Sequence, residues 1–330
     1  MEIVFDAHFD VLMDILHFRR QGERRVFETR HLPNLKSVGV NALICSIFVD
    51  DAYIPEMALR HALNQIAALR EDIADSPDFF EVCLDAGQAR RAAEDGKVAI
   101  FLSLEGAEPL GSDILLLRTF YDLGVRLLGL TWSRRNYLAD GSAFSWNDAP
   151  ARPGGLTKLG REAVAKAREL GMVVDVSHLN DAGFEDVAGM LKKPFIASHS
   201  NSRALCGSAR NLTDAQIKAI AASGGVIGIN CYSPFVAEDA GERTAENLLA
   251  HLDYIGGLAG FDHVGMGLDI CDCLESAALA QPRKTHEKDV FENHAAADKF
   301  FSVIRARYPE STSAKILGGN FIRVLEEVLG

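Results

Sequence analysis

Short apolar segments alternate with amphipathic segments along most of this chain. The apolar segments are rich in Val, Ile and Leu and carry little charge, which is typical of strands buried on both faces of a parallel sheet. Each is followed by a stretch with helical periodicity. Eight such segments predict strands at residues 3–8, 40–49, 97–105, 125–132, 172–178, 194–200, 224–230 and 263–269.

Capping signals support several of the predicted helices. One helix is expected to begin at Thr157 and stop at Gly171, and Gly124 suits the C′ position of another. Thr213 and Gln216 have the spacing of a capping box. A fourth helix carries its large apolar residues on one predicted stripe, formed by Leu59, Leu63, Ile66 and Ile73.

Eight successive β-then-α units predict an α/β fold, a (β/α)8 TIM-like barrel with residues 1–330 in a single catalytic domain. A doubly wound sheet would need fewer strands and usually a phosphate-binding glycine motif, and no GxGxxG follows a strand here. Long loops are expected at about 133–156 and 271–295, after the fourth and eighth strands. Such loops form pocket walls and lids at the mouth of a barrel.

Composition excludes some classes of partner. The net charge is −12 and no basic stripe is visible, so nucleic acid is not an expected partner. No apolar run reaches the length of a membrane span, and the N-terminus lacks a signal-peptide pattern. A cytoplasmic location is therefore expected. The cysteines show neither CxxC spacing nor a disulfide framework, and most are expected to be reduced: Cys45, Cys83, Cys206, Cys231, Cys271 and Cys273.

Polar residues that can bind metal or move protons recur where the predicted strands end. A barrel brings the carboxyl ends of its strands into one ring, whatever their separation in sequence. Burying several such groups without partners would cost several kcal/mol per ion, and a divalent metal removes that cost. Imidazole and carboxylate without thiolate suit Zn²⁺, with Mn²⁺, Co²⁺ or Fe²⁺ as alternatives. The residues are His8, Asp10, Glu105, His178, His199 and Asp269.

The spacing suggests how two ions could be shared. His8 and Asp10 are two residues apart, on one face of an ideal strand, and could bind one ion. His178 and His199 come from neighbouring predicted strands and could bind a second. Glu105, with two oxygens, could bridge both. Two ions about 3.5–4 Å apart can deprotonate a bridging water and polarise a carbonyl.

Asp269 is left over from this scheme and could take the proton of that water and pass it to a leaving amine. Taken singly, each residue has an ordinary alternative. A lone histidine at a strand end is more often a core or surface residue, and Asp269 alone could cap the next helix. The joint pattern favours a metal site, because all six residues fall at strand ends. The strand starts offer mainly Lys97, Arg126 and His263.

The motifs together resemble one family, the renal-type (membrane) dipeptidases of peptidase family M19 and their bacterial relatives. The resemblance runs along almost the whole chain. It implies a TIM-like barrel of the metallo-dependent hydrolase type that holds a binuclear zinc site. The motifs that carry it are "DAHFD", "SLEGAEPLG", "LGVRLLGLTW", "NYLADG", "GGLTKLGREAVAKARELGMVVDVSHLND", "PFIASHSNSRAL", "RNLTD", "GGVIGIN" and "KILGGNFIRVLEEV".

The resemblance also implies roles for individual residues. Asp269 is similar to the family's acid/base carboxylate. Arg210, in "RNLTD", is similar to the residue that holds the substrate carboxylate, although taken alone it would be a surface arginine near a helix start. Family members cleave dipeptides, many accept a D-residue at the C-terminal position, and some are homodimers. The metal ligands correspond to His8, Asp10 and Glu105 for one zinc, and to Glu105, His178 and His199 for the other.

Two positions depart from the family pattern. Trp132 stands where well-studied members carry a histidine, and an indole can donate one hydrogen bond but cannot accept one. We expect Trp132 to line the substrate pocket, with a core aromatic as the alternative. The chain reads "LDICDC" where members usually read "SDFDG". Cys271 and Cys273 could therefore approach the metal, but they are expected to be bystanders.

The sequence thus predicts a zinc-dependent dipeptidase that uses a metal-bridging hydroxide. The alternative enzyme is a binuclear metal amidohydrolase that acts on N-acyl amino acids or other non-peptide amides, which Trp132 and the "LDICDC" segment would allow. The third possibility is a degenerate barrel that binds peptide or metal without catalysing a reaction. The intact set of six strand-end residues argues against it.

Overall fold

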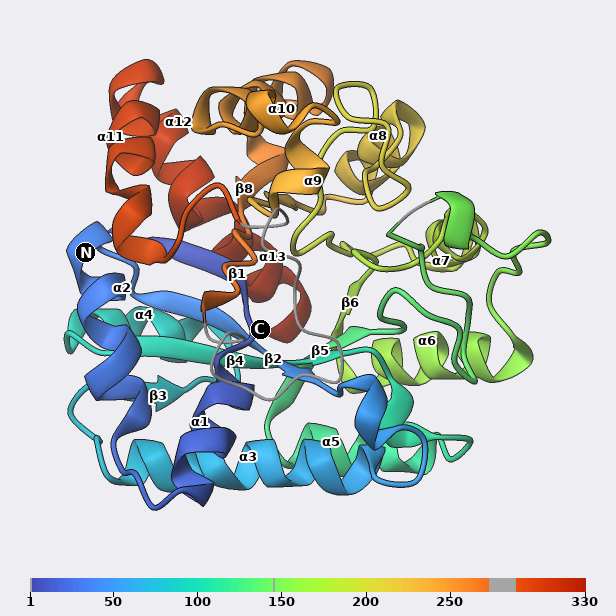
Figure 1. Cartoon of the computed structure of the whole chain (residues 1–330), viewed down its shortest axis with the longest axis horizontal. Helices are drawn as coiled ribbons and strands as arrows, with labels where there is room; N and C mark the ends of the chain where they lie inside the picture. Colours follow the sequence, from blue (N-terminus) through green and yellow to red (C-terminus); the bar gives the residue numbers. More distant parts are fainter. Residues whose placement is uncertain (1, 145, 273–288) are drawn as a thin grey trace.

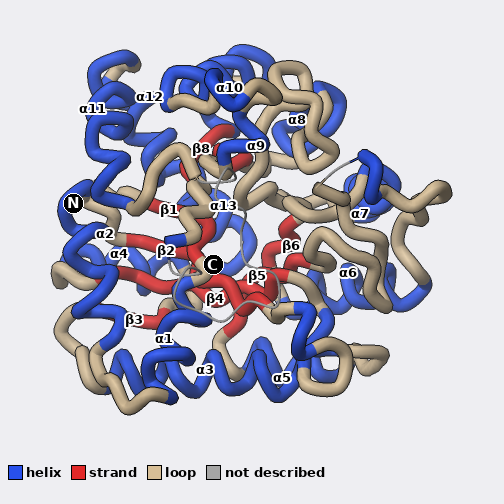
Figure 2. The backbone as a smooth tube through the Cα atoms, viewed as in Figure 1, coloured by secondary structure: helices blue, strands red, loops and turns tan. Residues whose placement is uncertain are grey.

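Parallel strands lie at the centre of the molecule and helices surround them (Figures 1 and 2). The computed structural model describes residues 2–144, 146–272 and 289–330. The strands within these ranges are β1 (Phe5–Phe9), β2 (Ala42–Phe48), β3 (Phe80–Val82), β4 (Val98–Glu105), β5 (Val125–Gly129), β6 (Val173–Asp175), β7 (Ile227–Ile229) and β8 (Val264–Met266).

The strands follow one another around a ring. Strands β1, β2, β4, β5 and β6 pair in this order, all parallel, and β3 pairs with the first residues of β4. Single bridges, from Asp175 to Ile196 and from Ala197 to Ile227, continue the ring into β7, which pairs with β8. The Leu268 amide, just beyond β8, donates to a carboxylate oxygen of Asp6 in β1 at 2.8 Å. The predicted TIM-like α/β barrel is confirmed.

The predicted strands differ from the observed ones in three ways. Residues 194–200 form only isolated bridges instead of a regular strand. The backbone is crowded there, since a Cβ on Gly228 or Gly267 would lie 2.0 or 1.7 Å from the Ser198 carbonyl oxygen. Strand β3 was not predicted. Strands β5, β6 and β8 end three residues before the predicted ends at 132, 178 and 269. The backbone beyond β6 bonds in part to a loop, since the Ser142 amide donates to the His178 carbonyl oxygen.

Most of the predicted capping signals operate as expected. Thr157 caps α6 by accepting from the Gly160 amide, and Gly171 ends that helix at φ +72°. Thr213 and Gln216 form the capping box of α8. The helices are α1 (Val11–Arg20), α2 (Leu32–Val38), α3 (Ala58–Ala74), α4 (Ala86–Glu94), α5 (Leu115–Asp122), α6 (Lys158–Leu170), α7 (Asp181–Met190), α8 (Asp214–Ala222), α9 (Ser233–Val236), α10 (Ala245–Ala259), α11 (Asp298–Arg307), α12 (Glu310–Ala314) and α13 (Asn320–Leu329).

The apolar stripe predicted on α3 was partly wrong. Ile66 is buried, but Leu63 is 37% exposed. The buried face instead includes Ala62 and Leu69, so small alanines take part in the packing that the large residues alone did not reveal. Among the described residues, no helix combines the length and the apolar composition that a bilayer crossing requires.

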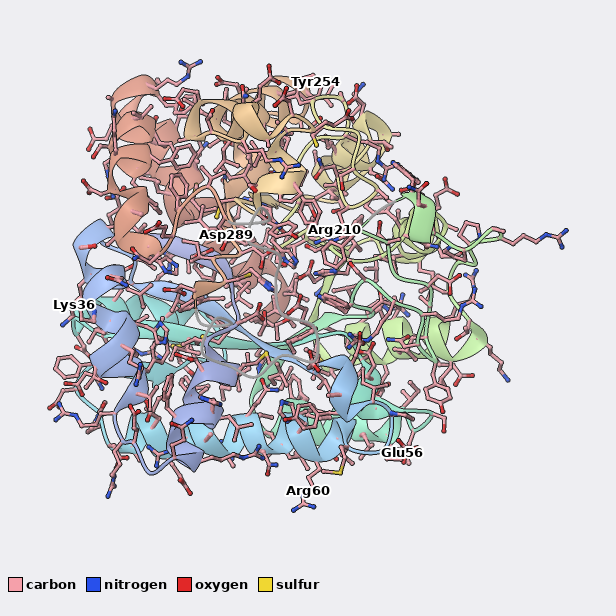
Figure 3. The ribbon with its side chains drawn as sticks, viewed as in Figure 1. Lys36, Glu56, Arg60, Arg210, Tyr254 and Asp289 are labelled. Carbon is pink, nitrogen blue, oxygen red and sulfur yellow. The ribbon has the colours of Figure 1, made fainter. Side chains whose placement is uncertain are left out.

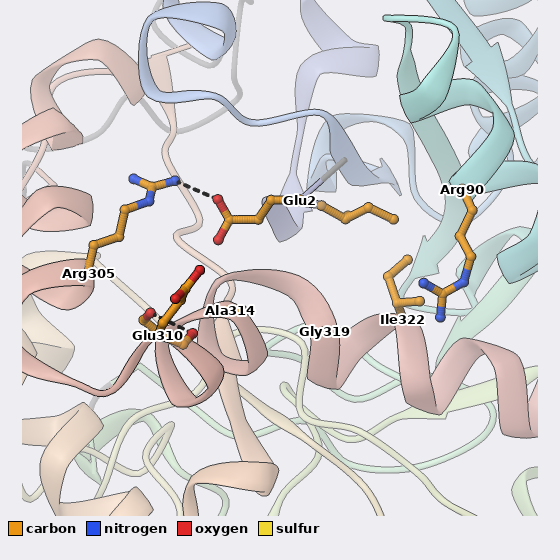
Figure 4. A pocket seen from close by; sticks show the side chains of 9 residues that line it. Glu2, Arg90, Arg305, Glu310, Ala314, Gly319 and Ile322 are labelled. Carbon is orange, nitrogen blue, oxygen red and sulfur yellow. Dashed lines mark hydrogen bonds and ion pairs between the residues drawn. The ribbon is translucent and has the colours of Figure 1, made fainter.

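Helix α13 packs against the strands where they begin. Phe5 of β1 stacks on Phe321 of α13 and on Phe101 of β4, with ring centroids 5.4 and 6.1 Å apart. These rings belong to one buried cluster that joins the first halves of the strands to α13. A surface pocket of about 510 Å³ lies at this same end, between Glu2 and the segment from α12 to α13 (Figure 4). The carboxyl ends of the strands lie away from it.

Candidate metal centre

The strand register places the predicted site residues at one level of the barrel. Phe48, Glu105, Gly129 and Asp175 are successive partners across β2, β4, β5 and β6. Glu105 therefore stands at the carboxyl rim. Trp132 and His178 lie three residues beyond this row, past the ends of β5 and β6. In the same way, His199 lies three residues beyond Ile196, and Asp269 lies three beyond Met266 of β8.

His8 and Asp10 also lie at this rim, but the local backbone structure differs from the ideal strand that was predicted. The pairing of β1 with β2 shifts register between Asp6 and Phe9, so this strand end is not ideal. Strand β1 stops at Phe9, and Asp10 is the N-cap residue of α1. The two side chains still meet, with His8 Nε2 3.7 Å from Asp10 Oδ1.

All six predicted residues converge. His8 Nε2 lies 3.4 Å from Glu105 Oε2 and 3.7 Å from Asp269 Oδ1. The other oxygen of Glu105 lies 3.0 Å from His178 Nε2, which is 2.8 Å from His199 Nε2. Glu105 thus touches histidines on both sides, which is the geometry that a bridging ligand needs.

Potential ligand atoms form two compact groups among the described residues, and both include His8. One group is His8, Glu105 and His199, and the other is His8, Asp10 and Asp269, with ligand atoms within 4.8 Å of one another in each. These groups overlap with the two predicted ligand sets but do not coincide with them. The division of the ligands between two ions stays a prediction.

Each of the three imidazoles is oriented by a serine. Ser46 Oγ lies 3.1 Å from His8 Nδ1, Ser133 Oγ lies 2.9 Å from His178 Nδ1, and Ser198 Oγ lies 2.7 Å from His199 Nδ1. A hydrogen bond at one ring nitrogen fixes the ring and directs the other nitrogen toward a metal. The Nε2 atoms all turn toward the cluster.

The tautomer of His199 follows from this network. Ser198 donates its hydroxyl hydrogen to the Asp175 carboxylate, so it can only accept from His199 Nδ1–H. His199 Nε2 then presents a lone pair. Because His178 Nε2 lies 2.8 Å away, a proton or a cation must lie between the two nitrogens. A metal ion in this position would bind the lone pair of His199 Nε2.

Electrostatics also fit a bound cation. Burial raises the pKa of Glu105 to about 8, and the nearby Asp10 contributes to the rise. Burial lowers the pKa of His8, but Glu105 and Asp10 raise it more, so it stands well above its ordinary value. Asp10 Oδ1 and Glu105 Oε2 are buried without a hydrogen-bond partner among the described residues. Buried carboxylate oxygens of this kind are suited to coordinate a divalent ion.

Asp269 is held in an unusual backbone conformation at the edge of this cluster. Its φ of +57° is rare for a residue other than glycine and costs about 1–3 kcal/mol. Asn230, which directly follows β7, donates to Asp269 Oδ2 at 2.9 Å. Burial raises the pKa of Asp269 to about 6, against the opposing effect of His8. A carboxylate with such a pKa can exchange protons near neutral pH.

Cys271 lies close to Asp269 and outside both groups of potential ligands. Its thiol donates to the Asp269 carbonyl oxygen at 3.2 Å and lies 3.7 Å from Asp269 Oδ1. Its role as a bystander stays a prediction. Cys273 and most of the loop predicted at 271–295 lie outside the described residues.

Arg210 is buried beside the metal centre, near the middle of the molecule (Figure 3). It donates to the Ser177 carbonyl oxygen and, at 3.5 Å, to that of His199. Within the described residues Nε has no hydrogen-bond partner and the guanidinium forms no ion pair. Burial lowers its pKa to about 10, so it remains charged at neutral pH. A buried cation of this kind is suited to receive an anionic group.

Trp132 lies next to the metal centre and is partly exposed. Its ring stacks on His178 at a centroid distance of 5.9 Å and an interplanar angle of 30°. The Arg134 guanidinium lies 4.9 Å from its ring centroid. Trp132 therefore belongs to the wall of the mouth instead of the barrel core, and its contact with substrate stays a prediction.

Asp6 is a supporting residue that the sequence analysis did not identify. It is fully buried, and one oxygen accepts from the Leu268 amide at 2.8 Å and from the His8 amide at 3.4 Å. The other oxygen lies 2.8 Å from His294 Nε2. One carboxylate thus links the backbone next to Asp269 with the backbone of His8.

The orienting serines and Asn230 were also missed. Asn230 is a polar residue at the end of a predicted strand, so the rule that identified Glu105 could have found it. Ser46 and Asp6 are polar residues inside apolar strand segments, which is a weaker signal of the same kind. Ser198 gave the same weak signal, since it lies inside the predicted strand at 194–200. Ser133 gave no signal of its own, because its role depends on how the loop after β5 folds.

A barrel whose mouth gathers three imidazoles with several carboxylates defines a class of protein, the metallo-dependent hydrolases. Sequence comparison refines this assignment. The model of the membrane dipeptidases, peptidase family M19, matches residues 1–329. The chain belongs to this family of metallo-dipeptidases.

Two solved structures agree with this assignment, and a further sequence relative is similar over most of this chain. The solved structure of dipeptidase AC, a metallopeptidase of family M19, is 33% identical and superposes with a TM-score of 0.87 over 100% of both chains. A metallopeptidase from Rhodobacter sphaeroides, solved with a phosphinate mimic of L-Ala-D-Ala, is 31% identical with a TM-score of 0.86 over 99% of both chains. A Klebsiella pneumoniae protein named for the pqqA 5′ region is 34% identical over 270 residues, 80% of this chain and 95% of its own.

Proposed function

We propose that this dipeptidase is a zinc enzyme with two ions per chain, bridged by Glu105. One ion would be held by His8 and Asp10 and the other by His178 and His199. The observation that carries the proposal is the convergence of the three Nε2 atoms on the buried carboxylates. Imidazole and carboxylate ligands without thiolate favour zinc among the common metals, with manganese, cobalt and iron as alternatives.

The bound metal would supply a Lewis acid that activates water and polarises the peptide carbonyl. The residues of the chain account for the remaining steps. Asp269, held by Asn230 at the rim, takes the proton of the attacking water and gives it to the leaving amine. Arg210 binds the substrate's C-terminal carboxylate through its charged guanidinium, whose Nε has no hydrogen-bond partner among the described residues. This anchor restricts cleavage to short peptides with a free C-terminus.

The preferred stereochemistry is part of the proposal. The Rhodobacter sphaeroides relative was solved with a mimic of L-Ala-D-Ala, which supports L-Xaa-D-Xaa dipeptides as substrates here. The single-domain organisation with loops at 133–156 and 271–295, and the homodimer, remain predictions.

Metal analysis combined with kinetics tests the proposal. The purified chain should contain about two equivalents of zinc and should cleave L-Ala-L-Ala or L-Ala-D-Ala. Glu105→Gln should lose metal together with activity. Asp269→Asn should keep the metal but lose about 10²- to 10⁴-fold in kcat, the usual contribution of a general acid or base. Cys271→Ser is the matched control for metal content, which should not change.

Two results would contradict the proposal. A double variant, Glu105→Gln with Asp269→Asn, that kept full activity would exclude the assigned roles. Turnover confined to substrates without a free amino group would instead favour the amidohydrolase acting on N-acyl amino acids. Dipeptides and N-acetyl amino acids should therefore be compared in the same assay.

A further inference from the structure

Aromatic side chains form a continuous surface along one side of the mouth, here named the aromatic wall. Phe144, in the loop after β5, lies at the centre of this wall. Its ring meets Trp132 at 5.2 Å and Phe235 at 5.8 Å, nearly parallel to the latter at 10°. The wall comprises Phe48, Trp132, Phe144, Tyr232 and Phe235.

The wall connects the metal centre with the predicted carboxylate anchor. At one end Trp132 stacks on His178, at 5.9 Å between centroids. At the other end the Arg210 guanidinium lies 5.3 Å from the centroid of Phe235. A ligand that spans the metal centre and Arg210 would therefore lie along the wall.

Packing between loops does not account for the whole wall. Phe235 is buried, as a packing aromatic should be, but Phe144 is 43% exposed. Trp132 and Tyr232 are partly exposed as well. Apolar area left open beside a polar site is typical of a surface that a ligand covers.

We propose that the aromatic wall binds the side chain of the substrate residue that bears the free carboxylate, and that the enzyme prefers a large apolar residue at this C-terminal position. This inference rests on the proposed function, because it takes Arg210 as the carboxylate anchor. The side chain of that residue branches one carbon away from its carboxylate. With the carboxylate on Arg210, the side chain lies within reach of Phe235 and Phe144.

The N-terminal residue of the substrate meets a different surface. It lies beyond the scissile bond, on the side of the metal centre where Asp10 and Asp269 supply carboxylates. These groups suit a free ammonium. The wall runs from the metal centre to Arg210, so the preference for size should be confined to the C-terminal residue of the dipeptide.

Two matched substrate series test the inference. The zinc-loaded chain is assayed with Ala-Gly, Ala-Ala, Ala-Leu and Ala-Phe, using both L and D C-terminal residues, and with Gly-Ala, Leu-Ala and Phe-Ala. We expect kcat/KM for Ala-Leu and Ala-Phe to exceed that for Ala-Gly by about 10- to 100-fold, the range for covering an apolar side chain. The reversed series should vary by less than about 3-fold. A flat first series, or a preference in the reversed series, would overturn the inference.

Variants in one loop connect the preference to the wall. Phe144→Ala should lower the ratio of kcat/KM between Ala-Phe and Ala-Gly by about 5-fold or more. Trp146→Ala is the matched control, since Trp146 is 57% exposed and its indole donates to the Gly207 carbonyl oxygen. That variant should keep the ratio. Equal ratios in both variants would exclude the wall as the source of the preference.

Cleavage and binding measurements together distinguish a failure of this inference from a failure of the proposed function. If no dipeptide of either series is cleaved, the proposed function fails. Calorimetric binding of the same dipeptides then decides the inference by itself. Tighter binding of Ala-Phe than of Ala-Gly would support the wall, and equal binding would overturn it.

Discussion

Replacing Asp6 by alanine should loosen the junction between β1 and β8 and weaken the metal centre. The buried carboxylate accepts from the Leu268 amide and lies in hydrogen-bond contact with His294 Nε2, both at 2.8 Å. Leu268 directly precedes Asp269, and His8 lies two residues beyond Asp6. The substitution therefore removes a support shared by two residues of the site.

The magnitude follows from the groups left without partners. Leu268 and His294 are buried, and an unpaired buried donor costs about 1–3 kcal/mol. Losing both partners should lower the free energy of unfolding by about 2–6 kcal/mol. Asp6→Asn should cost less, about 1–2 kcal/mol. Its amide oxygen can still accept from Leu268, and its NH₂ can donate to the other tautomer of His294.

Three measurements decide the outcome. Urea unfolding, followed by the fluorescence of the 2 tryptophans, gives the loss of stability. Zinc titration and kcat report the state of the site, and loss of a supporting partner typically costs about 10- to 100-fold in metal affinity or activity. Asp72→Asn serves as the control. Asp72 is another buried carboxylate, which accepts from the amides of Val26 and Phe27.

The control should lose stability while keeping its zinc affinity and kcat. Asp6→Ala should show lower stability, weaker zinc affinity and a lower kcat, and Asp6→Asn should lie between that variant and the wild type in all three quantities. If Asp6→Ala were destabilised like Asp72→Asn but kept zinc affinity and kcat, the junction would stabilise the barrel without positioning the site. The reasoning above would then be refuted.

Arg210→Met should raise KM for dipeptides about 10- to 100-fold, because a charge-assisted bond to the carboxylate is lost; an equal effect on uncharged amides would contradict its assigned role. Removing metal with a chelator should lower the melting temperature in scanning calorimetry, since Asp10 and Glu105 are then left without a cation, and zinc should restore it; an unchanged temperature would contradict the fit of the cluster to metal. Thr213→Ala should cost about 1 kcal/mol in urea unfolding at unchanged kcat/KM; no loss would mean that the capping box contributes nothing. Burial lowers the pKa of His61 in the folded chain to about 4, from 6.5. Between these two values the unfolded chain binds a proton at His61 that the folded chain does not. The free energy of unfolding should therefore fall as the pH drops from 6.5 to 4. His61→Gln should reduce that slope in urea titrations, and an identical slope would refute the contribution.

The convergence of the six candidate site residues could be predicted because barrel topology fixes where strand ends meet. Glu105, His178 and His199 need only the correct order of strands to come together. Asp10 joins the other residues even though its predicted local structure was wrong, since it is the N-cap residue of a helix and not part of an ideal strand.

The rest depended on interactions that no local pattern encodes. Residues 194–200 have a strand-like sequence, yet the close approach of Gly228 and Gly267 to Ser198 leaves only single bridges there. The role of Ser133 depends on the path of a long loop. The supporting role of Asp6 depends on hydrogen-bond partners that are 262 and 288 residues away in the sequence.

This separation in sequence determines when, during synthesis, the site can be completed. Synthesis proceeds from the N-terminus, and early segments begin to fold first. His8 and Glu105 therefore emerge from the ribosome long before the Leu268 amide and His294 can join Asp6. A growing chain should hold an open, incomplete barrel with no Asp269 beside its histidines. Peptide hydrolysis should begin only after synthesis has passed both Asp269 and His294.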